Sequence, residues 1–125
     1  MNILLDSHAL LWALHAPGKM RPAAVAAIED SRRAVYFSSA SAWELEIKAS
    51  LGKLALPSDW LDVAESTGFL HVPLTAAVAQ ASARLPRHHN DPFDRVLIAQ
   101  AIALNLQIAT RDGVFGSYGV ALLEI

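Results

Sequence analysis

Short apolar runs that alternate with helical patterns constrain the fold of this chain more than any other feature. Each run is too short to form an independent helix and is followed by polar or turn residues, as is typical of a buried strand. The expected strands are residues 2–5, 34–38, 68–72, 107–110 and, at an edge, 120–123. The expected helices are residues 7–15, 22–33, 42–51, 60–66, 75–85 and 92–105. This alternation indicates an α/β fold with a mostly parallel central sheet of four to five strands.

Several residues mark where the expected helices begin and end. Ser39 or Ser41 can cap the helix over residues 42–51, and Gly52 is a suitable residue to end it. Asn105 is a plausible left-handed residue at the end of the last long helix. We therefore expect these boundaries to be set locally.

The polar stretch before the last long helix contains two imidazoles and two carboxylates. Asp91 followed by Pro92 is typical of an N-cap and a first helical residue, because Pro needs no amide hydrogen there. Asp94 then lies in the first turn, where the positive end of the helix dipole favours an ionised carboxylate. We expect Asp91 to cap the helix and Asp94 to point outward as a metal ligand. The reverse assignment is the alternative.

Acidic residues recur near the carboxyl ends of the expected strands, the edge at which parallel α/β sheets bind ligands. They are Asp6 after the first strand, Glu44 in the helix after the second, Asp94 at the start of the helix before the fourth, and Asp112 two residues after the fourth. Glu46 falls about 200° away from Glu44 around their shared helix, so both cannot face one site.

Carboxylates gathered around one pocket repel each other and are costly to keep ionised without a cation. Ligand sets made only of oxygen suit Mg²⁺ or Mn²⁺, and Mg²⁺ usually binds through a few carboxylates together with phosphate oxygens. This chemistry is that of metal-assisted phosphodiester hydrolysis.

Each acid also has a purely local explanation. Asp6 could only cap the first helix, Asp94 could only favour its helix dipole, and Asp112 precedes a glycine in a common turn pair. Glu44 lies four residues before Lys48, a helical ion pair worth about 0.2–0.5 kcal/mol. The joint pattern favours a shared site over independent local roles.

Composition excludes several classes of protein. With 54% hydrophobic and 18% charged residues, the chain can bury a core, and we expect one domain over residues 1–125. The absence of Cys excludes disulfides and a Cys-based zinc site. We expect no membrane helix and no secretory signal, and hence a cytoplasmic protein. The net charge of −2 does not by itself indicate nucleic-acid binding.

Four motifs, in order along the chain, resemble those of PIN-domain ribonucleases, and most closely the VapC-type toxins of prokaryotic toxin–antitoxin systems. The motifs are ILLDSHALLW over residues 3–12, SAWE over 41–44, DPFDRVLIAQA over 91–101 and TRD over 110–112. Each motif alone is weak, whereas the four in sequence are specific and span most of the chain.

The resemblance implies a three-layer α/β/α fold, endoribonuclease activity that depends on Mg²⁺ or Mn²⁺, a homodimer and inhibition by a cognate antitoxin. It assigns the catalytic acids to Asp6, Glu44, Asp94 and Asp112. We expect Asp6, Asp94 and Asp112 to bind the metal and Glu44 to help hold the metal or its nucleophilic water. Thr110 matches the hydroxyl residue before the fourth acid. Ser7 stands where Thr is common, a change that should preserve the hydrogen bond.

Basic side chains near these acids are candidates for contact with an RNA substrate. Arg95 and Arg111 adjoin two of the acids and could bind phosphate or balance charge in the site. His88 and His89 could contact phosphate or a base, although we favour solvated loop positions for both. The tryptophans could stack on bases, but packing in the core or against a partner is favoured for Trp12, Trp43 and Trp60.

Two other kinds of function are alternatives to a ribonuclease toxin. A different acid-rich phosphoryl-transfer domain fits poorly. A response-regulator receiver needs a late Lys, yet none follows Lys53, and a haloacid-dehalogenase-like phosphatase needs an acid where His8 stands. A catalytically silent PIN-like interaction module would not need the four acids. Nothing in the sequence identifies which RNA would be cut.

Overall fold

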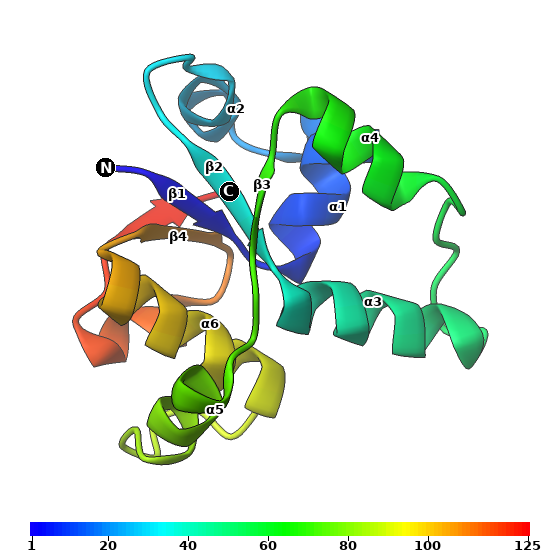
Figure 1. Ribbon diagram of the computed structural model, residues 1–125. Coiled ribbons are helices and arrows are strands. Elements are labelled where there is room, and N and C mark those ends of the chain that lie inside the picture. Colours follow the sequence, from blue (N-terminus) through cyan, green and yellow to red (C-terminus); the bar gives the residue numbers. More distant parts are fainter.

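A computed structural model describes residues 1–125 and contains one five-stranded sheet with helices on both faces (Figure 1). The strands are β1 (Ile3–Leu5), β2 (Val35–Ser38), β3 (Leu70–Val72), β4 (Gln107–Thr110) and β5 (Leu122–Glu124). The α-helices are α1 (Ser7–His15), α2 (Pro22–Glu29), α3 (Ser39–Ser50), α4 (Trp60–Thr67), α5 (Ala76–Ala83) and α6 (Pro92–Leu104). Two 3₁₀ helices, η1 (Pro17–Lys19) and η2 (Gly113–Tyr118), complete the fold.

The sheet is parallel throughout, with strand order β3-β2-β1-β4-β5. β1 lies at its centre, where Ile3 pairs with Val35 on one side and with Gln107 on the other. β5 lies at one edge, as expected for the last strand. Because every strand runs in the same direction, all the carboxyl ends meet at one edge of the sheet.

The central strand shows why the fold has three layers. Ile3 and Leu5 contribute to one buried cluster and Leu4 to another, so successive side chains of β1 are buried on opposite faces. Helices α1, α2 and α4 supply the first cluster, and α6 supplies the second, with α5 packed against α6 (Figure 1). The expected three-layer α/β/α architecture is confirmed.

Most helix ends lie within two residues of the sequence-based prediction, but two differ by three residues or more. α3 begins at Ser39, because Ser38 and not Ser39 or Ser41 is its N-cap, accepting a hydrogen bond from the amide of Ala40 at 3.1 Å. α2 ends at Glu29, earlier than the predicted residue 33. The carboxylate of Asp30 accepts the backbone amide of Arg32 at 3.0 Å, a local bond that replaces the next helical turn.

Left-handed residues close three helices. Asn105 has φ of 53° after α6, and Gly52 has φ of 72° after α3, so both predicted terminators are confirmed. Gly68 has φ of 95° at the end of α4, which delays β3 to Leu70 and shortens the strand predicted over residues 68–72. Neither 3₁₀ helix, η1 or η2, is among the helices predicted from the sequence.

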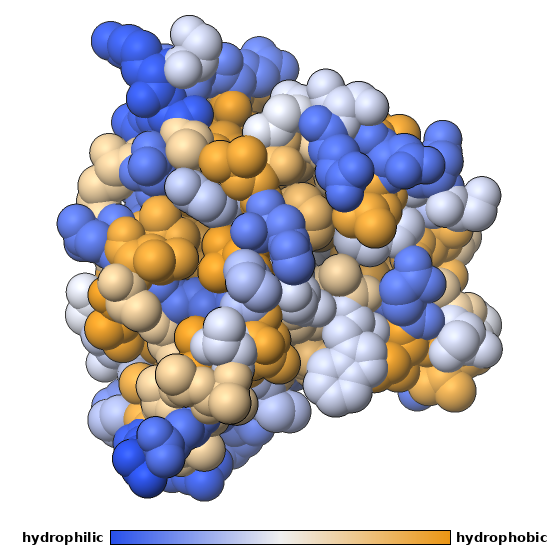
Figure 2. Space-filling view, viewed as in Figure 1, coloured by the Kyte–Doolittle hydropathy of each residue, from blue (hydrophilic) through white to orange (hydrophobic).

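The surface mixes apolar and charged residues. Figure 2, drawn from the same side as Figure 1, shows apolar residues in several separate areas divided by hydrophilic ones. The large exposed apolar side chains are accordingly scattered over many elements, and include Trp43, Leu51, Leu61, Leu70, Ile102, Leu104 and Val114. None of the helices has the length and apolar character needed to cross a lipid bilayer.

Candidate metal centre

The four predicted acids line one cavity of about 470 Å³ at the carboxyl edge of the sheet. Asp6 follows β1, Glu44 lies in α3, Asp94 lies in the first turn of α6, and Asp112 follows β4. The rest of the lining is Ser7, His8, Lys48, Asp91, Arg111 and Phe115, of which Phe115 alone is apolar. The fold therefore gathers carboxylates from four distant parts of the chain into a polar cavity.

Asp6 is both a helix cap and a member of this cavity. Its Oδ1 accepts the amide of Ala9 at 2.8 Å, which caps α1. The residue is only 8% exposed, and burial raises the pKa of its carboxyl. The hydroxyl of Thr110 and the amide of Ala9 oppose that rise by hydrogen bonding, whereas Glu44 adds to it. The capping role and the site role are thus compatible.

Glu44 is held from two sides. Its Oε1 accepts a hydrogen bond from Ser7 Oγ of α1, and its Oε2 lies 3.2 Å from Lys48 Nζ one turn along α3. The ion pair considered from the sequence therefore forms within the cavity. Glu46 faces elsewhere and accepts a hydrogen bond from Trp60 Nε1 at 2.8 Å, as its position around the helix predicted.

Asp91 and Asp94 differ in the way their spacing predicted. Asp91 is the N-cap of α6, with its Oδ1 accepting the amide of Asp94 at 3.0 Å. The Asp94 side chain is 24% exposed, and its carboxylate has no backbone donor. Burial, followed by the negative charges of Asp91, Glu44 and Asp6, raises the pKa of Asp94 to about 7, against the opposing effect of His89. A nearby cation would therefore favour the ionised form of Asp94.

The turn after β4 places the fourth acid. Thr110 is 2% exposed, and its Oγ1 accepts the amide of Asp112 at 3.0 Å. Asp112 Oδ1 in turn accepts the amide of Val114 at 2.9 Å and caps η2. Its other oxygen, Oδ2, lies 3.3 Å from His89 Nε2 at the cavity. As with Asp6, one carboxylate serves a local turn and the shared site.

The structure separates the two neighbouring histidines, which look equivalent in the sequence. His88 is exposed, with its ring edge-on to Tyr118 at 5.1 Å between centroids. His89 is turned inward, with Nε2 3.0 Å from Asp94 Oδ2 and its side chain 15% exposed. The preferred expectation of a solvated loop position is thus wrong for His89. No sequence signal distinguishes the two, because their orientation depends on the path of the loop.

The two candidate arginines also differ. Arg95 is 3% exposed, and its guanidinium donates hydrogen bonds to backbone carbonyls, among them those of Ser82 at 2.8 Å and Leu85 at 2.9 Å. This placement suits loop anchoring and does not suit the contact with RNA considered for Arg95. Arg111 is exposed at the cavity, with its guanidinium carbon 5.2 Å from the centroid of the Trp12 ring.

The three tryptophans have three different environments. Trp60 is 3% exposed and lies in the core, in edge contact with Phe37. Trp12 is partly buried and contacts Arg111. Trp43 is 59% exposed and meets Phe93 edge-on at 5.4 Å, so packing in the core is wrong for this residue.

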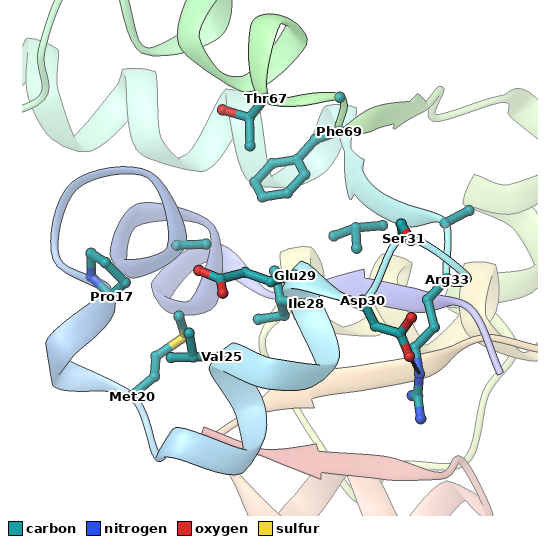
Figure 3. Close-up of a pocket in the computed structure, with 14 residues that line it drawn as sticks. Pro17, Met20, Val25, Ile28, Glu29, Asp30, Ser31, Arg33, Thr67 and Phe69 are labelled. Carbon is teal, nitrogen blue, oxygen red and sulfur yellow. Dashed lines mark ion pairs between the residues drawn. The ribbon is translucent and has the colours of Figure 1, made fainter.

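A second cavity, of about 430 Å³, lies at the opposite edge of the sheet and has a different character (Figure 3). Figure 3 shows Phe69 on one side of it, with Val25, Ile28 and Met20 on the other. Asp30 and Arg33, which are also part of the lining, form an ion pair at 3.9 Å. The two acids here, Glu29 and Asp30, do not form a cluster of the kind seen at the carboxyl edge.

The donor set at the carboxyl edge fits a hard divalent cation. Asp6 and Glu44 are buried, and burial is the main reason why the pKa values of Asp6 and Asp94 are raised, so a bound cation would favour the ionised carboxylates. Oxygen donors in a polar, open cavity favour Mg²⁺ or Mn²⁺ over a softer metal. A single bound cation would relieve the repulsion and leave room for a phosphate.

Comparison with known proteins places these observations in a family. Residues 3–120 match the PIN domain family. No curated protein sequence matches the chain. Solved structures with a similar fold include VapBC2 of Rickettsia felis bound to a promoter DNA fragment, with TM-score 0.70, 14% identity and 98% of both chains covered. They also include DNA-bound VapBC of Salmonella typhimurium, with TM-score 0.66, 18% identity and 98% of this chain and 97% of that chain covered.

FitAcB of Neisseria gonorrhoeae is a third similar structure, with TM-score 0.61, 24% identity and coverage of 98% of this chain and 96% of that chain. Fold and site together define an α/β protein whose acidic centre lies at the carboxyl edge of a parallel sheet. Since the family match extends over nearly the whole sequence, the chain belongs to the PIN domain family.

Proposed function

We propose that this protein is a Mg²⁺-dependent endoribonuclease, with Mn²⁺ as a possible substitute, that acts as the toxin of a toxin–antitoxin pair in the cytoplasm. The observation that carries the proposal is the convergence of Asp6, Glu44, Asp94 and Asp112 on one polar cavity. Membership of the PIN domain family supports a nuclease, and the VapC-like motifs support RNA as the substrate.

Asp6, Asp94 and Asp112 would hold the cation in this function, because their carboxylates come from three segments around the cavity. A bound Mg²⁺ supplies positive charge that stabilises the phosphate as negative charge builds up on it. Glu44, fixed through one oxygen by Ser7, orients the attacking water. Water attacks phosphorus opposite the leaving oxygen and gives up a proton to solvent, the bond to that oxygen breaks, and the leaving oxygen takes up a proton from solvent.

Positive groups at the rim would position the RNA backbone. Arg111 is exposed beside the acids, and its contact with Trp12 restricts the directions its guanidinium can take. Lys48 lies in the cavity with half of its side chain exposed and can approach a phosphate while paired with Glu44. His88 is exposed beside Tyr118 and is a further candidate contact. These groups hold the phosphodiester against the carboxylates.

The proposed partners are a cognate antitoxin and a second copy of the chain. VapBC and FitAcB, whose structures have a similar fold, support the antitoxin. Trp43, exposed beside the half-buried Phe93, offers apolar surface for a second copy of the chain to cover in the homodimer.

A fluorogenic RNA assay on purified protein free of antitoxin tests the proposal. We expect cleavage with Mg²⁺, loss of cleavage with EDTA, and near-background rates for Asp6→Asn and Asp94→Asn. Asn can still cap α1 at position 6, so the loss would not reflect unfolding. Asp91→Asn, which keeps the cap of α6, and Glu46→Gln, on the far side of α3, are the matched controls and should retain most activity.

Metal-independent cleavage, or unchanged rates in Asp6→Asn and Asp94→Asn, would refute the assignment of the metal site. Absence of cleavage on structured, unstructured and ribosomal RNA alike would instead favour the catalytically silent interaction module.

A further inference from the structure

The ring of His89 has a different partner at each nitrogen. Its Nδ1 accepts a hydrogen bond from the backbone amide of Asp91 at 3.1 Å. A nitrogen that accepts cannot carry a proton, so the neutral ring bears its proton on Nε2. Nε2 lies 3.0 Å from Asp94 Oδ2 and 3.3 Å from Asp112 Oδ2. Neither contact has the geometry of a regular hydrogen bond, so the Nε2–H is buried between two carboxylates and faces both electrostatically.

The main chain of His89 is also fixed at both of its polar groups. Its amide donates to the hydroxyl of Tyr118 at 2.8 Å, and its carbonyl accepts from Arg95 Nη1 at 3.0 Å. The ring lies edge-on to Phe115, with 5.7 Å between centroids. These contacts come from two separate elements, η2 and α6, and leave the ring little freedom to rotate.

Arg95 extends this support to the whole loop before α6. Its guanidinium donates to the carbonyls of Ser82, Leu85 and Pro86 at distances of 2.8, 2.9 and 2.9 Å. Tyr118 adds a hydrogen bond from its hydroxyl to the carbonyl of Pro86 at 2.8 Å. The buried arginine thus anchors the segment that carries His89, which explains why a loop residue has a defined orientation.

The same contacts argue against His89 as a metal ligand, although its Nε2 and the two carboxylates are close enough to surround an ion. Coordination through Nε2 requires a lone pair there, so the ring proton would have to move to Nδ1. That proton would then face the amide hydrogen of Asp91, and two donors would oppose each other. The amide cannot turn away, because Asp91 caps α6 and is followed by Pro92.

We propose that His89 is a positioning residue whose Nε2–H, lying between Asp94 and Asp112, sets the separation at which these carboxylates take up a divalent cation. The inference rests on the proposed metal site and adds to it a residue that acts through the ligands. Two adjacent carboxylates repel each other, and one shared N–H offsets part of that repulsion. Each carboxylate oxygen that faces Nε2–H keeps a lone pair free, so the contact with His89 and the cation can coexist.

Nitrogen-15 NMR of the imidazole of His89 tests the tautomer directly at neutral pH. We expect Nε2–H in the metal-free protein and in the protein saturated with Mg²⁺. A proton on Nδ1 in either state, or loss of the Nε2 proton when Mg²⁺ is added, would overturn the inference. The measurement uses the wild-type protein and does not depend on catalysis.

Mn²⁺ binding, monitored by electron paramagnetic resonance, tests whether His89 affects the affinity of the site for a divalent cation. His89→Ala should weaken the affinity about 10–100-fold, the usual effect of losing a partner that orients metal ligands. His89→Gln should recover most of it, because the Gln amide can donate from near the position of Nε2. His88→Ala, which removes the exposed neighbour, should bind Mn²⁺ like the wild type.

The outcomes distinguish this inference from the proposed function. Equal Mn²⁺ affinity in the wild type and His89→Ala would refute the positioning role and leave the metal site in place. A wild type that binds no Mn²⁺ would refute the metal site itself. A positioning role further requires that excess Mg²⁺ restores RNA cleavage by His89→Ala and does not restore it in Asp94→Asn.

Discussion

Asp94→Asn should stabilise the metal-free protein, because the carboxylate of Asp94 is held among other negative charges. Its pKa is about 7 in the folded state, against an ordinary value of 3.8. At about 1.36 kcal/mol per pKa unit, this difference corresponds to about 4 kcal/mol of opposition to the ionised form. Solvent screening at a side chain that is 24% exposed reduces the expected effect to about 1–2 kcal/mol.

The sign of the pH dependence follows from proton binding. Between pH 3.8 and about 7 the folded protein holds a proton on Asp94 that the unfolded chain releases. The free energy of unfolding of the metal-free wild type therefore falls as pH rises through this window. Above about pH 7 Asp94 is ionised in the folded protein, and its full unfavourable contribution to the free energy of unfolding is present. Below pH 3.8 Asp94 is protonated in both states, so it should cause no difference in stability between the wild type and Asp94→Asn.

Urea unfolding in EDTA, measured from pH 4 to 8, is the assay. We expect the free energy of unfolding of Asp94→Asn to exceed that of the wild type by about 1–2 kcal/mol at the upper end of this pH range. In thermal unfolding the same difference should raise Tm by roughly 4–8 °C. Mg²⁺ should reverse the order, since it stabilises only a protein that binds it.

Asp62→Asn provides a matched control for this experiment. Asp62 and Asp94 are both the third residue of their helices, so each favours the helix dipole, but Asp62 is exposed outside the cavity. Asp62→Asn should lower the free energy of unfolding by about 0.3–1 kcal/mol, because the dipole of α4 loses a favourable negative charge. The same loss in Asp94→Asn, or an unfolding free energy of the wild type that rises between pH 4 and 7, would refute the argument from crowded charge.

Three further predictions concern the residues around the acids. Ser7→Ala should slow RNA cleavage by roughly tenfold, because Glu44 loses the hydrogen bond from the Ser7 hydroxyl. Ser7→Thr keeps a hydroxyl and should cleave RNA at about the wild-type rate. Arg111→Ala should weaken RNA binding and leave Mn²⁺ affinity unchanged. A plot of the logarithm of the RNA-binding constant against the logarithm of salt concentration should become shallower by about 1. Arg95→Met should cost about 3 kcal/mol in urea unfolding, because it leaves buried carbonyls without donors; a loss below about 1 kcal/mol would contradict the anchoring role.

Much of the fold could be predicted because its signals are local or periodic. Asp91 and Pro92 start α6 where expected, and Asn105 ends it, since capping depends on neighbouring amides and on backbone conformation. Errors occurred where several residues could serve equally. Three serines precede the predicted body of α3, and their order along the chain does not say which hydroxyl meets a free amide.

The site was predictable in its acids but not in its support. The position of Asp6, Asp94 and Asp112 relative to strand ends follows from the rule that parallel strands present their carboxyl ends at one edge. Arg95, which adjoins Asp94 in the sequence, was considered for the site, yet its side chain turns the other way into the loop carbonyls. Adjacent residues on a helix point about 100° apart, so nearness in sequence does not decide which reaches the cavity.

The sequence by itself determined the alternation of strands and helices, the capping of α6 and the set of acids, because these depend on apolar periodicity and on contacts within one turn. Only the tertiary structure decided that His89 faces Asp94 and Asp112 while His88 faces solvent. The physical reason is that the orientation of a loop residue is set by contacts from distant segments. Here the distant contact comes from Tyr118, 29 residues along the chain, and Arg95, 6 residues away in α6, adds a second. No pattern within the loop itself encodes either contact.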